Sequence, residues 1–500
     1  MSDAPIEQFS RGEQLFEMWR RRVGFVVAPL AFVAVWFTPW IGISIEAHRL
    51  AAIMAAVVVL WITESIPMPA TALAGACACV ICGVAPIKNV FAPFADPIMF
   101  LFIGSFILAR AIFIHKLDRR VAFGVLSLPA IGARPSRILF AFGAVTAVLS
   151  AWMSNTATTA MMFAIGMSIL AFFLHSGVKI DRRYATGLML MTSFAASIGG
   201  LATPVGSPPN LIGLGYIKDA TGVSITFFQW MALGVPVVTV LFLFMYVYLN
   251  WFCPSGVREV PGGHEMLDQH RRSLGPWTRG QISTLIAFAL TVTLWITPGL
   301  IALVGGSDFP LYLALNKYLP EAVVALLGAS LLFVLPGDKG ERAITWKEAE
   351  QIDWGVVLIY GGGFALSILS QETGLAKALA EAMKQAVPMS SGVMLLFVAT
   401  LVAALTSELT SNTASANLII PVVIGYAQAM GVDPLEPAIG ATFGASLGFM
   451  LPVSTPCNAI VYGSGFIPIG RMIRYGFLLD IAGVFVVTIV IRTLLPLVRP

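Results

Sequence analysis

Apolar segments long enough to cross a membrane recur along the whole chain. Hydrophobic residues make up 58% of the 500 residues and charged residues only 11%, a composition typical of membrane proteins. A helix needs about 20 apolar residues to cross the hydrocarbon core, where every backbone polar group must be satisfied within the protein. The sequence therefore predicts an all-α polytopic membrane protein with about 11 transmembrane helices. The expected spans lie near residues 23–40, 50–65, 69–85, 97–115, 184–200, 226–252, 280–300, 320–336, 354–371, 434–451 and 474–497.

Two further apolar regions are broken in the middle by the same polar triplet. Regions 136–174 and 390–428 contain Ser-Asn-Thr at 154–156 and at 411–413. Such a break at membrane depth is tolerated only where it is buried in protein or lines a water-filled cavity. Each region is therefore predicted to be a re-entrant helical hairpin with the triplet at its tip. Because Ser, Asn and Thr are preferred helix N-caps, the second arm should begin at the tip.

The two halves of the chain carry the same features in the same order. Ser154 and Ser411 are 257 residues apart, as are Asp96 and Asp353. Five full crossings and one hairpin in each copy would turn the second copy upside down relative to the first, as in many secondary transporters. The expected units are 1–48, a cytoplasmic amphipathic helix ending at Arg20–Arg22 and the first transmembrane helix; 49–252, repeat 1; 253–279, a cytoplasmic linker; and 280–500, repeat 2.

A proline-containing motif follows the triplet in each half. PVGSPPN occupies 204–210 and PVSTPCN occupies 452–458. Proline interrupts a helix and frees carbonyl groups. With Ser and Thr hydroxyls and Asn oxygens, these carbonyls form neutral cages that suit sodium, whereas calcium usually recruits carboxylates. Two facing helix N-termini at the tips can bind an anion without a buried Lys or Arg, so the sequence predicts cation cages beside an anion site.

The distribution of basic residues predicts the orientation in the membrane. The net charge is +4, and 21 of the 30 Lys and Arg residues fall on one side of the expected topology. The positive-inside rule makes this side cytoplasmic, with the N-terminus inside and the C-terminus outside. The charge thus reports topology, and nothing supports a nucleic-acid partner. The predicted cytoplasmic segments are 1–22, 116–137, 179–183, 253–279, 337–353 and 471–474.

Other classes of membrane protein have less support. An ATP-driven pump would need the phosphate-binding motif G-x-x-x-x-G-K-[ST], which the sequence lacks. An enzyme would need acids, histidines or a metal cluster at the tips, whose residues are neutral. An anion channel stays open as an alternative, because selectivity filters also use polar re-entrant loops.

The motifs resemble those of a known family, the divalent anion/sodium symporters. The resemblance covers nearly the whole chain and rests on both triplets, on TESIPMPATAL at 63–73, on TPVGSPPNLI at 203–212 and on LPVSTPCNAIVYGSG at 451–465. It implies a homodimer in the bacterial inner membrane that moves its hairpins and broken helices as an elevator. The expected activity is sodium-coupled symport of C4-dicarboxylates such as succinate, malate or fumarate. The alternatives are dicarboxylate exchange and transport of sulfate or citrate by the same fold.

The resemblance also implies the site residues. Two departures from the family pattern are Cys457, where a second proline is usual, and Ser407, where Thr is common. Cys457 leaves the geometry of the second broken helix open. Ser407 retains the hydroxyl group that a Thr would supply, so little effect is expected there. Sodium site 1 would use Ser150, Ser154, Asn155 and the Gly206 backbone; sodium site 2 would use Ser407, Ser411, Asn412 and the Ser454 backbone; and the substrate would meet Asn155, Thr156, Ser207, Asn412, Thr413, Thr455 and Pro456.

Overall fold

The computed structural model describes residues 11–40, 42–131, 134–175, 181–306, 308–386, 389 and 391–498. These residues form helices and loops, and the sole β-bridge among them joins Pro336 to Arg342. Nine described helices are long and apolar enough to cross a membrane, or ten if a bent pair counts as one span. The predicted all-α membrane fold is confirmed, although by this count the described residues hold nine or ten spans and not eleven.

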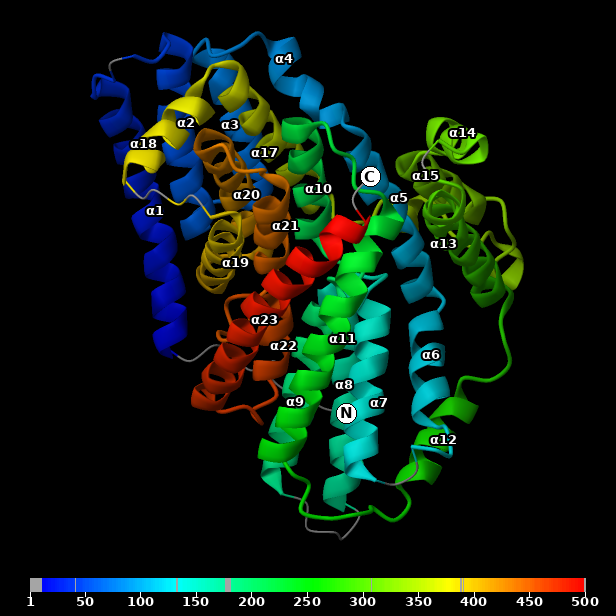
Figure 1. The fold of residues 1–500 in the computed structure, drawn as a ribbon. Coiled ribbons are helices and arrows are strands. Elements are labelled where there is room, and N and C mark those ends of the chain that lie inside the picture. Colours follow the sequence, from blue (N-terminus) through cyan, green and yellow to red (C-terminus); the bar gives the residue numbers. More distant parts are fainter. Residues whose placement is uncertain are drawn as a thin grey trace.

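The helices of the two halves follow one another in a similar order (Figure 1). The first half comprises α1 (Arg11–Phe37), α2 (Ile45–Thr63), α3 (Met68–Ile81), α4 (Ile87–Phe91), η1 (Ala92–Ala95), α5 (Pro97–Ile114), α6 (Leu117–Leu126), α7 (Pro135–Ser150), α8 (Asn155–His175), α9 (Arg182–Gly199), α10 (Pro208–Thr221), α11 (Phe227–Phe252) and the linker helix α12 (Gly263–Ser273). The second half comprises α13 (Arg279–Gly305), α14 (Pro310–Tyr318), α15 (Glu321–Leu332), η2 (Asp338–Gly340), α16 (Trp346–Ala349), α17 (Trp354–Glu372), α18 (Leu375–Ala386), α19 (Gly392–Leu409), α20 (Asn412–Met430), α21 (Leu435–Gly444), α22 (Pro456–Tyr462) and α23 (Ile469–Val498).

The N-terminal prediction of an amphipathic helix ending at Arg20–Arg22 is wrong. The described part of this segment is one continuous helix, α1, and the three arginines lie inside it. Ending a helix at Arg22 would leave the carbonyls of its last turn without partners. Continuing into the apolar stretch satisfies them, and Arg20 pairs with Glu64 at 3.1 Å. Residues 1–10 lie outside the described part of the chain.

Both predicted hairpins are present as pairs of helices, and their second arms begin at the triplets. The first hairpin is α7 and α8, and the second is α19 and α20. Asn155 and Asn412 are the first residues of α8 and α20. The Ser411 hydroxyl caps α20 by accepting a hydrogen bond from the Ala414 N–H at 3.2 Å. The polar triplets therefore act as helix starts, as their composition predicts.

Both proline motifs lie where a helix is interrupted. The segment 200–207 separates α9 from α10, and 445–455 separates α21 from α22. Asn210 bridges the first break, because its Nδ2 donates to two carbonyls of this segment, both at 2.8 Å. Asn458 bridges the second break in the same way, at 3.1 and 2.9 Å. Each asparagine thus partly replaces the helical hydrogen bonds that the break removes.

Matching glycines let long helices lie directly on the two breaks. A Cβ on Gly234 of α11 would lie 2.5 Å from the Leu201 carbonyl oxygen, and one on Gly476 of α23 would lie 2.4 Å from the Phe449 carbonyl oxygen. No side chain fits at such distances, so glycine is required for this packing. Gly234 and Gly476 differ by 242 residues, and Leu201 and Phe449 by 248. The two halves thus repeat this contact.

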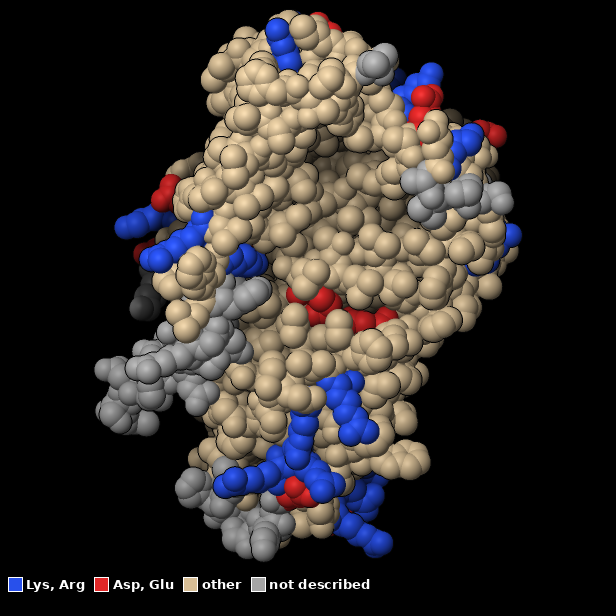
Figure 2. Space-filling model, turned by 90° about the vertical axis from the view of Figure 1, so that its left-hand side faces the viewer, with Lys and Arg blue, Asp and Glu red and all other residues tan. Residues whose placement is uncertain are grey.

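Charged side chains are distributed unevenly over the surface. Figure 2 shows a wide, hollowed area of uncharged side chains on the upper part of one face, Asp and Glu side chains along its lower edge, and a group of Lys and Arg side chains toward the lower end. The connection between α11 and α12 lies at that same end in Figure 1.

Candidate functional site

The two hairpin tips and the two helix breaks line a single cavity of about 780 Å³. Residues from both triplets meet there, although they are 257 positions apart in the chain. The opposite wall comes from α3, α5 and the start of α17. The predicted substrate residues Asn155, Thr156, Ser207, Asn412, Thr413, Thr455 and Pro456 all line this cavity, as do the predicted sodium ligands Ser154, Gly206, Ser411 and Ser454.

A cluster of oxygen atoms lies behind the first tip. The Asn155 amide lies 2.7 Å from the Ser150 hydroxyl, which is fully buried. In the amide orientation that satisfies its neighbours, Nδ2 donates to the carbonyls of Ala196 at 3.2 Å and Gly206 at 3.1 Å. In the opposite orientation the amide oxygen faces only oxygen atoms. An amide oxygen surrounded by oxygen atoms is an arrangement that a bound cation would stabilise.

The second tip carries an equivalent cluster. The buried Ser407 hydroxyl lies 2.8 Å from Asn412 Oδ1 and 2.9 Å from the Ala445 carbonyl oxygen. Ser454 is held beside them, because its hydroxyl donates to the Glu408 carbonyl at 3.1 Å and to the Glu408 carboxylate at 2.5 Å. The second cluster therefore includes a buried carboxylate next to its wall, which the sequence analysis did not predict.

The predicted sodium ligands occupy two layers. Ser150 and Ser407 do not line the cavity but lie directly behind the tips, fully buried. Ser154 and Ser411 line the cavity at the starts of the second arms. A cation held by both layers would lie between the cavity and the protein interior.

Helix N-termini are directed toward the cavity from both hairpins. Residues at the starts of α8 and α20, and Ser207 and Pro208 at the start of α10, belong to its lining. The first N–H groups of a helix have no partner within the helix and carry a partial positive charge. The cavity therefore presents helix N-termini from both halves of the chain to an anion, which is the arrangement that the sequence predicts for an anion site.

The cavity also contains polar side chains that the sequence analysis missed. The Arg110 guanidinium of α5 donates to the Gln351 side-chain oxygen, and its Nε has no partner among the described residues. Asp353 caps α17 by accepting from the Val356 N–H at 3.3 Å. The sequence could have identified Arg110, because it is the lone Lys or Arg in the predicted span 97–115. An ionisable residue within a membrane span is a candidate functional residue.

Cys457 does not disturb the second helix break. α22 begins at Pro456, so the Cys457 N–H falls in the first turn, where a helix offers it no carbonyl. The thiol is buried and faces the hydroxyls of Thr156, Ser197 and Thr455. The second helix break therefore keeps a helix start at Pro456, although residue 457 is not a proline. The described residues hold no group of three or more His, Cys, Asp or Glu side chains able to bind a metal ion.

Sequence comparisons find relatives along the whole chain. A family model described as the sodium:sulfate symporter transmembrane region matches residues 19–498. A protein named sodium-dependent dicarboxylate transporter SdcS from Staphylococcus saprophyticus is 33% identical over 486 residues, which cover 95% of this chain and 91% of that protein. The protein of the same name from Staphylococcus aureus strain USA300 is 32% identical over 492 residues, with the same coverage.

Two solved structures share the fold. The YdaH transporter of Alcanivorax borkumensis superposes with a TM-score of 0.51 at 12% identity and covers 97% of this chain and 99% of its own. MtrF of Neisseria gonorrhoeae, described as one of a class of antimetabolite efflux pumps, superposes with a TM-score of 0.57 at 13% identity and covers 94% of each chain. At this level of identity the likeness concerns the fold alone.

Proposed function

Because the chain belongs to the sodium:sulfate symporter family, we propose that it is a secondary transporter that carries C4-dicarboxylates across the bacterial inner membrane together with sodium ions. The two curated relatives are sodium-dependent dicarboxylate transporters by name. The observation that carries the proposal is the position of Asn155 and Asn412. Each lines the cavity and also lies within 2.8 Å of a buried serine hydroxyl in an oxygen cluster.

We propose that sodium binds in these two clusters and that the dianion binds between them. Sodium site 1 comprises Ser150, Ser154, Asn155 and the Gly206 carbonyl; sodium site 2 comprises Ser407, Ser411, Asn412 and the Ser454 backbone. An amide can offer its oxygen to a cation and its N–H₂ to a carboxylate at the same time. Filling a cage therefore orients the amide and favours anion binding, and such coupling is reciprocal.

The transport step follows from the repeated geometry. The matched clusters, breaks and glycine contacts of the two halves support an inverted repeat, with the N-terminus in the cytoplasm and the C-terminus outside. We propose that the hairpins and broken helices move together against α2, α5, α13 and α17 as an elevator, with a second copy of the chain held by the stationary helices. Cysteine labelling that found residues 116–137 and 372–388 on the same side of the membrane would contradict the inverted repeat.

Uptake into proteoliposomes tests the activity. An inward sodium gradient should drive saturable accumulation of succinate, and replacing sodium with potassium or choline should abolish it. Competition by malate, fumarate, sulfate and citrate then identifies the preferred anion. Uptake that needs internal succinate but no sodium would instead identify an exchanger. A non-saturating anion current would identify a channel.

A further inference from the structure

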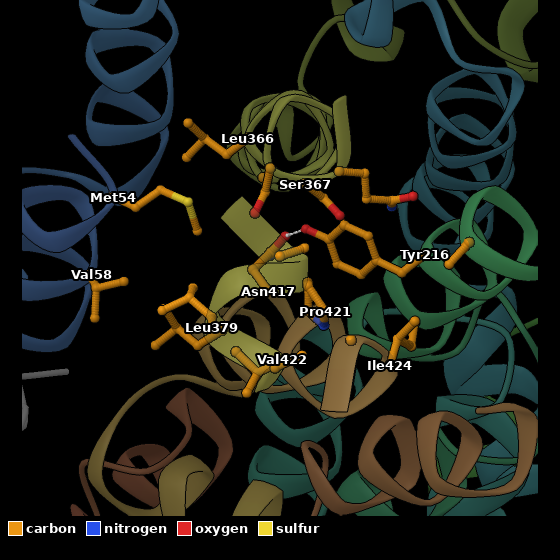
Figure 3. A pocket seen from close by; sticks show the side chains of 18 of the residues that line it. Met54, Val58, Tyr216, Leu366, Ser367, Leu379, Asn417, Pro421, Val422 and Ile424 are labelled. Atoms are coloured by element: carbon orange, nitrogen blue, oxygen red, sulfur yellow. Dashed lines mark hydrogen bonds between the residues drawn. The ribbon is translucent and has the colours of Figure 1, made fainter. Parts of the chain in front are cut away.

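A second cavity, of about 250 Å³, lies between α2, α17 and α18 on one side and α10 and α20 on the other (Figure 3). Each of these helices contributes side chains from one of its faces to the lining of the cavity. On α18, Ala376, Leu379, Ala380 and Met383 follow the spacing of a single helical stripe. Because α20 is the second arm of a hairpin, this cavity separates a helix that we propose to be mobile from α2 and α17, which we propose to be stationary.

The inner end of this cavity is connected to the substrate site by hydrogen bonds. Tyr216 Oη donates to Asn417 Oδ1 at 2.7 Å, and Asn417 Nδ2 donates to the Thr413 carbonyl at 2.9 Å. Thr413 lines the larger cavity. Gly363 of α17 faces the same amide so closely that a Cβ there would lie 2.2 Å from Asn417 Oδ1. A molecule at this end would therefore contact the helix that carries a substrate-binding tip.

The lining defines the chemistry of a ligand. The residues around the cavity include Met54, Val58, Leu379 and Val422 on apolar walls, and none of the lining residues is charged. Ser367 is a buried residue that lines the cavity. Figure 3 shows Ser367 close to the Tyr216 and Asn417 side chains, whereas the apolar side chains fill the other side. A buried hydroxyl beside a hollow calls for a neutral polar group.

The exposed rim of the cavity is apolar on the side of α18 and the middle of α20, and its exposed polar residues are Gln371 and Gln428. Leu379 is 37% exposed, Met383 40% and Val422 43%. Val422 belongs to a helix with the length and hydropathy of a membrane span, and α18 follows another such helix. A ligand that reaches the cavity between these side chains comes from the hydrocarbon phase.

We propose that this cavity binds an uncharged, single-chain amphiphile from the membrane, with its hydroxyl or carbonyl group at Ser367 and its chain against Met54, Val58 and Leu379. The bound molecule fills the space between α20 and the helices α2, α17 and α18 that face it. It therefore stabilises the arrangement of helices seen in this structure over any arrangement in which α20 has moved away from them. The expected effect on transport, which rests on the proposed function, is non-competitive inhibition.

Trp61 reports on binding because it lines the cavity and is buried. The probe is 11-bromo-1-undecanol, whose bromine quenches tryptophan fluorescence on contact. We expect saturable quenching in purified protein that 1-decanol competes away and that Trp61→Phe removes. Quenching that rises linearly with probe concentration, or that survives unchanged in Trp61→Phe, would overturn the proposal.

A filled cavity provides the second test. Val58→Phe places a ring in the cavity, whereas Val59→Phe changes the neighbouring residue of α2, which is not part of the lining. We expect Val58→Phe to weaken probe binding about tenfold and Val59→Phe to leave it unchanged. Probe binding is measured without transport, so it can succeed even if the chain proves not to carry dicarboxylates. Equal effects of the two variants would refute the site, and bound probe without reduced succinate uptake would refute the inhibitory role.

Discussion

The Ser407 hydroxyl donates a 2.8 Å hydrogen bond to Oδ1 of Asn412, and this pair joins a buried oxygen cluster to the cavity that carries the second hairpin tip. Asn412→Ala removes the group that both ligands would share, so it should weaken both sodium binding and succinate binding. The expected loss for each ligand is the free energy of coupling between them, about 1–3 kcal/mol. Asn412→Asp keeps an oxygen for the cation but adds a negative charge beside the dianion. It should therefore retain sodium binding and lose succinate binding.

Binding titrations on the purified protein, each ligand with and without the other, measure this coupling. Thr410→Ser, which alters a neighbouring buried hydroxyl residue outside the cavity lining, serves as the matched control. If Asn412→Ala bound succinate with unchanged affinity and unchanged sodium dependence, the triplet would have no role beyond capping α20.

Two glycines should differ in how well they tolerate a methyl group. A Cβ on Gly200 would lie 2.4 Å from the Asn155 side-chain oxygen, whereas one on Gly448 would lie 3.0 Å from the Ser407 hydroxyl and 3.5 Å from Asn412 Oδ1. Gly200→Ala should displace the Asn155 amide and lower sodium affinity by about tenfold or more. Gly448→Ala should have a smaller effect, which the sodium dependence of uptake measures. Equal sodium affinities in the two variants would show that the first cluster does not bind the ion.

Glu408 braces the second helix break by accepting hydrogen bonds from the N–H groups of Met450 at 2.8 Å and Leu451 at 3.2 Å. Glu408→Ala leaves these two part-buried donors without their acceptor and reduces the Ser454 hydroxyl to its bond with the residue-408 carbonyl, so it should lower the free energy of unfolding by about 1–3 kcal/mol. It should also weaken sodium binding at site 2, because Ser454 forms part of that site. Thermal unfolding and sodium titration measure the two effects.

Asp480 provides the contrast, because its carboxyl group is buried directly beside that of Glu408. Two adjacent buried acids repel each other when both are ionised, so removing one of them relieves this repulsion. Asp480→Asn should therefore leave stability unchanged or raise it. A loss of stability as large as that of Glu408→Ala would show that Asp480 is itself a structural ligand of the break.

The sequence predicted those parts of the fold that depend on local chemistry. Apolar length predicts the spans, and the triplets predict the hairpin starts at Asn155 and Asn412, because helix capping depends on the residues at the start. The two proline motifs recur as a pair in the repeat. The family resemblance that these motifs carry implied the polar lining residues of the tips and breaks, but not the apolar lining residues Met153, Ala157 and Val205.

What the sequence could not show depends on contacts between distant segments. Glu408 follows an expected sodium ligand but acquires its role from the N–H groups of residues 450–451, more than 40 positions away. The short helices α6, α14 and α18 were not predicted, since their apolar stripes are too short to be read as spans.

Asp118 predicts a change of stability with pH. Burial raises the pKa of this carboxyl, in the short helix α6, to about 6 from its ordinary value of 3.8. The folded protein therefore binds a proton that the unfolded chain releases between about pH 4 and pH 6, and stability falls as the pH rises through this range. The shift of about 2 pH units corresponds to at most about 3 kcal/mol.

Asp118→Asn should remove this dependence and leave the protein more stable at pH 7 than the parent chain. Thermal unfolding between pH 4.5 and pH 7.5 measures it, and Asp308→Asn, an exposed acid, should behave as the parent does. A stability that rises with pH equally in the parent and in Asp118→Asn would contradict the assignment.

Arg110 is the basic side chain on the wall of the substrate cavity, opposite the hairpin tips. Its guanidinium donates to Gln351 and lies 5.8 Å from the centre of the Phe113 ring, which fixes its position. The acidic side chain of the same lining, Asp353, is engaged in capping α17, so the Arg110 guanidinium is the charged group that would attract a dianion before it reaches the helix N-termini. Arg110→Gln should therefore raise the KM for succinate by about tenfold at low ionic strength and by less at high salt, while sodium binding in the absence of substrate stays unchanged.

Lys88→Gln, which removes a surface charge outside the cavity lining, should leave both the KM for succinate and sodium binding unchanged. A KM for Arg110→Gln that rises equally at all salt concentrations would mean that Arg110 contacts the bound dianion directly, and an unchanged KM would mean that the helix N-termini alone draw the substrate in.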